Sequence, residues 1–433
     1  MSKVSKRREP TIFIYFIYLI STQLFTYTGY SKLHLGWFFV ICCGSLYFIL
    51  LYNAIYIKRK CERTNFSSYH FVSLFVILPL FTTVSCYIAH GQSIPLSIWV
   101  MWYHFTVSIY FYFVYIGFSK KQILDFLTIL MLVKLGLTVI EQFTYPYVPF
   151  TARLVDGFTS EGKFQEVEVR SGIYRYTIAD AYYLYLIIGF YSFTQLIKAK
   201  DIKNCFLFIA SCVGIYMDQS RQIMVSFMLS LFIISFLQSG TAKLKYLLLF
   251  GILIISLYGF YDFLFGELTE QTGNQMSDGY IRFVAYSYYY TNMGGMLTTL
   301  FGNGFGGFSF SAWGKEIAYQ EVTLGLNRAD IGVVGALHLL GVVFVVVFFS
   351  YYILVLLRYW KYIDGYIKMM FISILINIPM LFPLYNLPLG GIDFFMGCLF
   401  YLTDKSIRDN KKKKEIMIAF KLIAKSKGND RFL

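Results

Sequence analysis

The sequence predicts an all-α polytopic membrane protein with about twelve transmembrane helices and both termini in the cytoplasm. Composition is the first observation behind this fold class, because 57% of the 433 residues are hydrophobic and only 14% are charged. Soluble domains carry about 45–50% apolar and about 25% charged residues. The second observation is that apolar runs of about 20 residues, the length that spans a bilayer, recur along the chain. We therefore expect residues 1–433 to form a single integral membrane domain.

The apolar runs give twelve predicted spans, and each is helical because lipid offers no hydrogen-bond partner to an open sheet edge. The first run follows basic residues as in a signal peptide, but it continues to about Tyr30 without a small-residue cleavage site, so we expect it to be retained. The seventh and eighth spans are short and meet at Asp218 to Arg221; a single helix there would place the basic tail outside. The spans cover 11–30, 36–57, 67–90, 96–118, 122–143, 176–197, 204–217, 222–238, 244–265, 329–357, 365–386 and 388–404.

Basic clusters assign the ends of these spans to sides of the membrane. Cytoplasmic loops are enriched in Lys and Arg, and in the twelve-span arrangement every cluster falls on one side. The net charge of +14 therefore reflects topology and does not indicate binding of nucleic acid. The tail 405–433 alternates basic and apolar residues, which suits a helix lying on the anionic leaflet or a solvated basic tail. The clusters are Lys3 to Arg8, Lys58 to Arg63, Lys120 with Lys121, Lys198 to Lys203, Lys243 with Lys245, Arg358 with Lys361, and Lys405 to Lys414.

Two long loops are predicted on the outer side, at 144–175 and 266–328. Structureless connections longer than about 12–15 residues are usually functional or disordered, so we expect the chemistry there. The second loop holds a tyrosine-rich segment, 279–296, whose pattern fits a helix at the headgroup level or only an aromatic belt. The glycine-rich run Gly302 to Gly307 follows no strand of a βαβ unit, so we interpret it as a flexible loop and not as a dinucleotide site.

The sequence predicts neither a disulfide framework nor a metal site. Its seven cysteines include no CxxC pair, and no Asp-x-Asp pair is present to hold a nucleotide-sugar through a divalent cation. We therefore expect no cofactor.

Arginine is concentrated on the predicted outer side, where six of the nine basic residues are Arg. Arg binds phosphate through two hydrogen bonds and keeps its charge near lipid, whereas Lys suffices to orient a loop. We interpret these arginines as a phosphate clamp; the alternative is that they pair with loop acids such as Glu161, Glu166, Glu168, Asp218 or Asp330. The four near predicted helix ends are Arg175, Arg221, Arg282 and Arg328.

Asp330 and His338 are the candidate general bases. Asp330 opens the tenth span, where a carboxylate near arginines is placed to take a proton, although an acid at a helix start can also be only a cap. The same choice applies to Asp180, one turn into the sixth span. His338 lies on a small-residue helix face with Gly332 and Gly335, which is also typical of helix packing.

One pair of charges within a span favours a transporter. Lys134 lies deep in the fifth span, and Glu141 follows seven residues later on the same face. Charges at that depth cost roughly 2.5–3.5 kcal/mol and are usually paired or functional.

Three local patterns, in this order along the chain, give a family resemblance. They are Arg175 leading into the sixth span with Asp180, Ser220-Arg221 at the start of the eighth, and LFGNGFGGF at 300–308 followed by NRADIGVVG at 327–335. With twelve spans and two long outer loops, this order resembles the bacterial O-antigen and capsular polysaccharide polymerases, the Wzy family, which are related to the O-antigen ligases. The resemblance covers about 144–345, and the rest of the chain only as hydrophobic spans.

The resemblance implies a glycosyltransferase of the bacterial plasma membrane. It would join oligosaccharide repeat units carried on undecaprenyl pyrophosphate into O-antigen, capsule or exopolysaccharide, with the flippase and the chain-length regulator of the pathway as partners. It assigns substrate binding to Arg170, Arg175, Asp180, Arg221, Arg282 and Arg328. The ligase relatives carry a histidine where this chain has Asn327 to Asp330, which favours a polymerase over a ligase. A flippase for lipid-linked glycans is the other alternative, and the base stays open between Asp330 and His338.

Overall fold

The computed structural model describes residues 68–144, 169–170, 173–174, 181–198, 201–237, 244, 251, 280–307, 310–385 and 391–426. The predicted spans 11–30 and 36–57, nearly all of 244–265 and most of the loop 144–175 lie outside these residues. The described chain is almost entirely helical, and its one strand pair is the antiparallel hairpin of β1 (Val169–Arg170) and β2 (Ile173–Tyr174). The helices are α3 (Tyr69–His90), α4 (Ile94–Met101), η2 (Trp102–Ser108), α5 (Ile109–Ile116), α6 (Lys120–Thr144), α7 (Ala181–Lys198), α8 (Ile202–Met217), α9 (Arg221–Leu237), α12 (Ile281–Thr291), α13 (Met296–Phe301), α14 (Ala312–Ala318), η4 (Tyr319–Thr323), η5 (Arg328–Ile331), α15 (Gly332–Leu354), η6 (Val355–Tyr359), η7 (Trp360–Tyr362), α16 (Gly365–Asn377) and α17 (Gly391–Ser426).

Three of the described helical stretches are long and apolar enough to cross a membrane: Tyr69–His90, Lys120–Thr144 and Arg328–Tyr362. The pair Ile94–Met101 and His104–Ile116, bent by 64°, makes a fourth if it is one span. Several long apolar helices are thus compatible with a membrane protein. The count of twelve spans stays a prediction.

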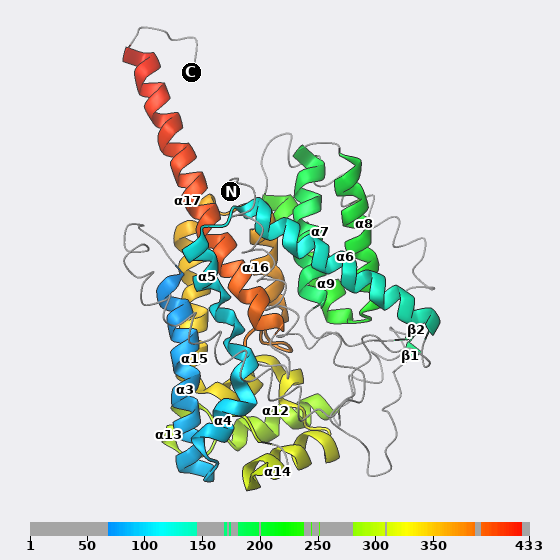
Figure 1. Ribbon diagram of the computed structural model, residues 1–433, viewed down its shortest axis with the longest axis vertical. Helices are drawn as coiled ribbons and strands as arrows, with labels where there is room; N and C mark the ends of the chain where they lie inside the picture. Colours follow the sequence, from blue (N-terminus) through cyan, green and yellow to red (C-terminus); the bar gives the residue numbers. More distant parts are fainter. Residues whose placement is uncertain are drawn as a thin grey trace, which may run out of the picture.

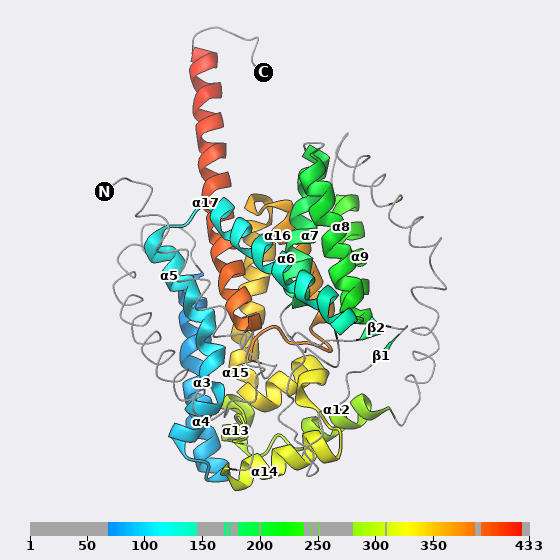
Figure 2. The ribbon, with the colours of Figure 1, turned by 45° about the vertical axis from the view of Figure 1, so that its right-hand side comes forward.

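The helices form a bundle with two different ends (Figures 1 and 2). At one end, which we call the tail end, α17 leaves the bundle and Lys120 meets the turn between α15 and α16 through Asp364. At the other, the loop end, α12, α13 and α14 lie across the bundle. Of the predicted basic clusters, those within the described residues, at the starts of α6 and α8, the ends of α7 and α15 and along α17, all lie at the tail end. Arg282 belongs to α12 at the loop end, and Arg221 and Arg328 begin α9 and η5 at helix ends that face away from the tail end.

Four predicted spans agree with observed helices to within about two residues. They are 67–90, 122–143, 204–217 and 222–238, which correspond to α3, α6, α8 and α9. The region of the two short spans is therefore a helical hairpin and not one helix. Its turn places Gln219 at φ 53°, and the Gln219 side chain donates a 2.9 Å hydrogen bond to the carbonyl of Tyr216.

The predicted span 96–118 is broken in the structure into α4, η2 and α5. The 3-10 turn η2 lies so close to α17 that a Cβ added at Gly397 would be 2.6 Å from the Val107 carbonyl oxygen. Close backbone packing against a glycine, which hydropathy does not register, accompanies the bend.

The last two predicted spans also have different bounds. Helix α16 ends at Asn377, two residues before Pro379, which has no backbone N–H to donate to Leu375. Helix α17 begins at Gly391 and continues without interruption to Ser426, so the predicted basic tail is largely helical and extends the last span away from the bundle (Figure 1).

A buried carboxylate fixes the start of α3 to α17. Asp404, 3% exposed, accepts hydrogen bonds from the Ser68 backbone N–H at 2.9 Å, from Ser68 Oγ at 2.7 Å and from Tyr110 Oη at 2.6 Å. The carboxylate thus satisfies an N–H group at a helix start that has no partner within the helix. This contact joins elements more than 300 residues apart and sets the register of α3 in the bundle.

Candidate functional site at the loop end

The loop end is covered by three short helices from the predicted second outer loop. In α12 the side chains of Ala285 and Tyr289 are buried while Phe283 and Tyr290 are 58% and 69% exposed. One turn of spacing separates the buried pair, so α12 has an inner and an outer apolar face. The predicted tyrosine-rich helix is thus present, and its exposed rings fit a helix at a membrane surface.

The glycine-rich run Gly302 to Gly307 has no regular secondary structure, as expected of a loop, but it is mostly buried. It crosses α15 where that helix is broken at Gly341, which has φ 81° and ψ 170°. The break frees two helix carbonyls, and the N–H groups of Asn303 and Gly304 donate to them at 2.8 Å to His338 O and 3.0 Å to Leu339 O. Both backbones must approach closely, since a Cβ at Gly302 would lie 2.2 Å from Leu339 O.

Arg328 holds this loop in place from inside. Its Nε donates to Glu321 Oε1 at 2.7 Å and its Nη1 to the Gly304 carbonyl at 3.2 Å, and the residue is only 7% exposed. Of the two alternatives from the sequence, a phosphate clamp or pairing with a loop acid, Arg328 shows the second. Its partner, Glu321, was not among the acids expected.

His338 lies deeper along α15, enclosed by aromatic rings. Its ring packs edge-on against Tyr289, with centroids 4.8 Å apart, and lies 6.3 Å from the ring of Trp313. Trp313 in turn stacks on His90 at 3.6 Å, and His90 Nε2 donates to Asn303 Oδ1 at 2.9 Å. His338 is 3% exposed, and its Nδ1 has no hydrogen-bond partner among the described residues.

Arg221, Arg282 and Asp330 belong to three segments that meet at one turn, residues 377–380. Beside Arg221, Gln222 Nε2 donates to Asn377 O at 2.9 Å. Arg282 Nη1 lies 3.7 Å from Met380 Sδ. Two residues after Asp330, Gly332 packs so closely on the turn that a Cβ there would lie 2.1 Å from the carbonyl oxygen of Ile378. All three charged residues are half-buried, and we call them the rim residues.

The other predicted site residues are described only in part. Arg175 and Asp180, with the side chain of Arg170, lie outside the described residues. The hairpin that carries the backbone of Arg170 is held at the end of α6, where the Gln142 side chain accepts from Tyr174 N at 2.9 Å and donates to Tyr174 O at 2.7 Å. Residue 170 is therefore anchored beside the predicted fifth span.

A buried histidine and carboxylate pair was missed by the sequence analysis. His104 Nδ1 donates to Asp393 Oδ2 at 2.6 Å, and both residues are at most 1% exposed. Asp393 Oδ1 also accepts from the N–H of Tyr385, a non-glycine residue at φ 57° whose ring stacks on His104. The pair joins η2, the start of α17 and the turn before it. The sequence did contain a signal for this pair, because His104 and Asp393 are ionisable residues inside apolar runs. That criterion was used above only for Lys134 and its neighbour Glu141.

The described residues contain no group of three or more His, Cys, Asp or Glu side chains placed to hold a metal ion. Comparison of the chain with protein-family models, with curated proteins and with solved structures found no match. The resemblance to the polysaccharide polymerases therefore rests on the residues of the chain itself.

Proposed function

We propose that this chain is a multi-pass protein of the bacterial plasma membrane, with twelve spans and both termini in the cytoplasm. The support is the separation of charge between the two ends of the bundle. Within the described helices, the lysine-rich clusters lie at the tail end, whereas Arg221, Arg282 and Arg328 belong to α9, α12 and η5, at helix ends that face away from it. Because Lys and Arg of short loops are retained on the cytoplasmic side, the tail end would face the cytoplasm and the loop end the outside.

The reaction we propose is the joining of oligosaccharide repeat units carried on undecaprenyl pyrophosphate, at the outer face of the membrane. The observation that carries this proposal is the meeting, at residues 377–380, of the segments that hold Arg221, Arg282 and Asp330. A glycan on a lipid pyrophosphate already has a good leaving group, so catalysis needs cations where charge develops on the phosphate. The two half-buried arginines would supply them.

The proposed base is Asp330, which would take the proton of the acceptor sugar hydroxyl. It is one of the half-buried rim residues, whereas His338 is 3% exposed and enclosed by rings. A positioned base contributes roughly 10²–10⁴-fold to such a step. Arg328 would act indirectly, because its guanidinium holds the loop through Glu321.

A lipid-linked glycan flippase is the second candidate, and the buried charges of α6 favour it. Lys134 and Glu141 are both 0% exposed in a helix that is long and apolar enough to span a membrane. Charges at such positions often line transport pathways.

Reconstitution of the full chain in vesicles with lipid-linked repeat units tests the proposal. A polymerase makes a ladder of products without ATP or nucleotide, a flippase only moves the substrate across the bilayer, and a ligase needs a different acceptor. Arg221→Lys removes the planar fork but keeps the charge, and we expect polymer to fall about tenfold or more, since hydrogen bonds to charged groups contribute roughly 1.5–3 kcal/mol. Lys315→Gln, which removes an exposed cation at the same end, is the matched control.

Translocation of substrate without any ladder would refute the polymerase and support the flippase. Full polymer yield with Arg221→Lys would refute the arginine clamp. We also expect Asp330→Asn to block ladder formation at normal protein level, and an unchanged rate would refute the assignment of Asp330 as the base.

A further inference from the structure

Five cationic side chains gather on three aromatic rings at the tail end, where α15 gives way to α16 and α17 passes. Lys411 Nζ lies 4.9 Å from the ring centroid of Tyr359 and 5.4 Å from that of Tyr362. Lys414 and Lys361 lie 5.9 and 5.2 Å from the Tyr362 ring. The set, which we call the basic-aromatic cluster, also includes Lys368 over Trp360 at 5.0 Å and Arg358 over Tyr359 at 5.8 Å.

The cluster is held by hydrogen bonds between α17 and the turn after α15. Asn410 Nδ2 donates to the Tyr362 carbonyl at 2.8 Å and to Asp364 Oδ1 at 3.0 Å. The N–H of Asp364 donates to Ser406 Oγ at 2.8 Å. These hydrogen bonds hold α17 against the turn after α15. Cations from segments about 50 residues apart in the sequence therefore lie on the same rings.

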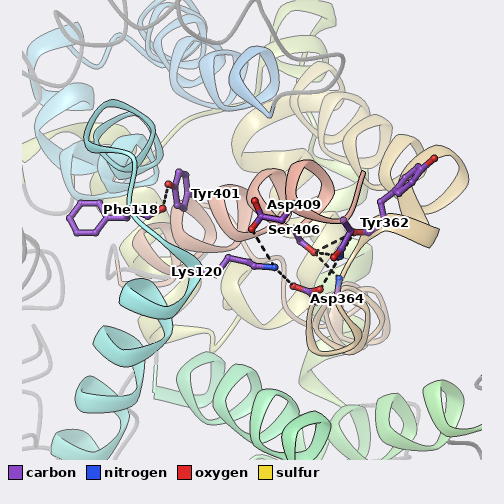
Figure 3. A network of polar contacts seen from close by, with 8 residues as sticks. Phe118, Lys120, Tyr362, Asp364, Tyr401, Ser406 and Asp409 are labelled. Carbon is purple, nitrogen blue, oxygen red and sulfur yellow. Dashed lines mark hydrogen bonds and ion pairs between the residues drawn. The ribbon is translucent and has the colours of Figure 1, made fainter. Parts of the chain in front are cut away.

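Two acids beside the cluster, Asp364 and Asp409, are already paired with another cation. Lys120 Nζ lies 2.8 Å from Asp364 Oδ2 and 3.7 Å from Asp409 Oδ2, as Figure 3 shows. Among the residues that the structure describes, none of the five cations of the cluster forms an ion pair. Like charges gathered on the same few rings repel one another, so an external anion would stabilise the arrangement.

The position of the cluster along the bundle indicates which anion. The apolar stretch Arg328–Tyr362 ends within the cluster, so its tyrosines and its tryptophan lie where the hydrocarbon core would give way to headgroups. Phospholipid phosphates occupy that level, and basic residues at the cytoplasmic ends of spans attract anionic lipids. We propose that the basic-aromatic cluster binds the phosphate groups of anionic phospholipids at the tail end.

Two pairs of neighbouring lysines on α17 allow a matched test. Residues three apart lie on nearly the same helix face, so Lys411 and Lys414 face the rings while the exposed Lys412 and Lys413 point elsewhere. The variants Lys411→Gln with Lys414→Gln, and Lys412→Gln with Lys413→Gln, change the net charge equally. Native mass spectrometry of the full chain in detergent would measure the binding of phosphatidylglycerol and of phosphatidylcholine, with circular dichroism as the check on folding.

We expect the wild type to prefer phosphatidylglycerol and the Lys411 and Lys414 double variant to lose about tenfold or more in affinity, against about threefold or less for the control pair. Tyr362→Leu should also weaken binding severalfold while Tyr362→Phe keeps it, because a cation is attracted to the face of either aromatic ring. Equal losses in the two double variants would overturn the site, since attraction to surface charge alone does not distinguish them. If millimolar inorganic phosphate displaced all of the bound phosphatidylglycerol, the assignment of the site to lipid would be overturned.

Discussion

Replacement of Gly341 by alanine probes the break in α15, the feature that the rest of the loop end is built on. An alanine Cβ there would lie 2.3 Å from Leu300 O, whereas real Cβ atoms essentially never approach another heavy atom within 3.0 Å. The backbones must therefore separate by at least 0.7 Å. That shift stretches the bonds that Asn303 and Gly304 donate to α15, which now measure 2.8 and 3.0 Å.

The expected cost of Gly341→Ala has two parts. Holding alanine at φ 81° and ψ 170°, a region that essentially only glycine occupies, costs roughly 1–3 kcal/mol. Weakening the two buried hydrogen bonds adds roughly 1–3 kcal/mol, so the free energy of unfolding should fall by about 2–6 kcal/mol. The proposed polymerase activity should fall with it, because residues 302–307 and Arg328 would lose their support.

Gly136→Ala in α6 is the matched control, because no heavy atom lies within 4 Å of its added Cβ. It should be neutral or stabilising by roughly 0.5–1 kcal/mol, the usual gain of alanine over glycine within a helix. Unfolding of both variants in mixed micelles, followed by intrinsic fluorescence against the mole fraction of denaturing detergent, gives the comparison. If Gly341→Ala proved as stable as Gly136→Ala, the described contact between the glycine-rich run and α15 would be wrong.

Two further predictions concern the tail end. Asp404→Asn places an amide N–H opposite the donors of Ser68 and Tyr110, so we expect the free energy of unfolding to fall by about 2–4 kcal/mol. Tyr110→Phe removes only one donor and should cost about 1 kcal/mol in the same unfolding assay. Equal losses for the two variants would contradict this account. Burial raises the pKa of Asp364, but hydrogen bonds from Lys120 and neighbouring side chains lower the pKa by more than burial raises it. The pKa of Asp364 in the folded protein is therefore below its usual value. Such a lowered folded pKa gives stability that is present above the unfolded value of about 3.9 and is lost as the pH falls through the folded pKa. The stability difference between wild type and Lys120→Met should therefore be about 1 kcal/mol at pH 7 and shrink below about pH 4, and a difference independent of pH would count against the pair.

The helices that the sequence predicts well are bounded by local signals. Helices α3, α6, α8 and α9 each coincide with an apolar run that ends at charged or turn-forming residues. The length of the apolar run and the residues at its ends together determine where a chain leaves lipid. The last predicted span ends at residue 404 because its apolar run stops there, and the tail beyond it was itself expected to be a helix or a solvated segment. Lys411 to Lys414 and Glu415 are good helix formers, so the helix continues after the apolar run stops.

What the sequence did not predict depends on contacts between distant residues. The break at Gly341 is satisfied by Asn303, 38 positions away, and His104 finds Asp393 at a separation of 289 residues. A single sequence contains no record of such pairings. For the same reason the outer arginines could be recognised as a group, while the burial of Arg328 and the partial exposure of Arg221 and Arg282 depend on the folded structure.

Helix α17 is a long rod that begins inside the bundle and extends beyond it. The same unbroken helix carries Asp393 in the middle of the protein, Asp404 beneath the start of α3 and the lysines over Tyr362. From Asp404 to Ser426 it extends roughly 33 Å, at about 1.5 Å per residue. Because α17 has no break between Asp393 and Lys414, one continuous helix links the basic-aromatic cluster to the buried histidine and carboxylate.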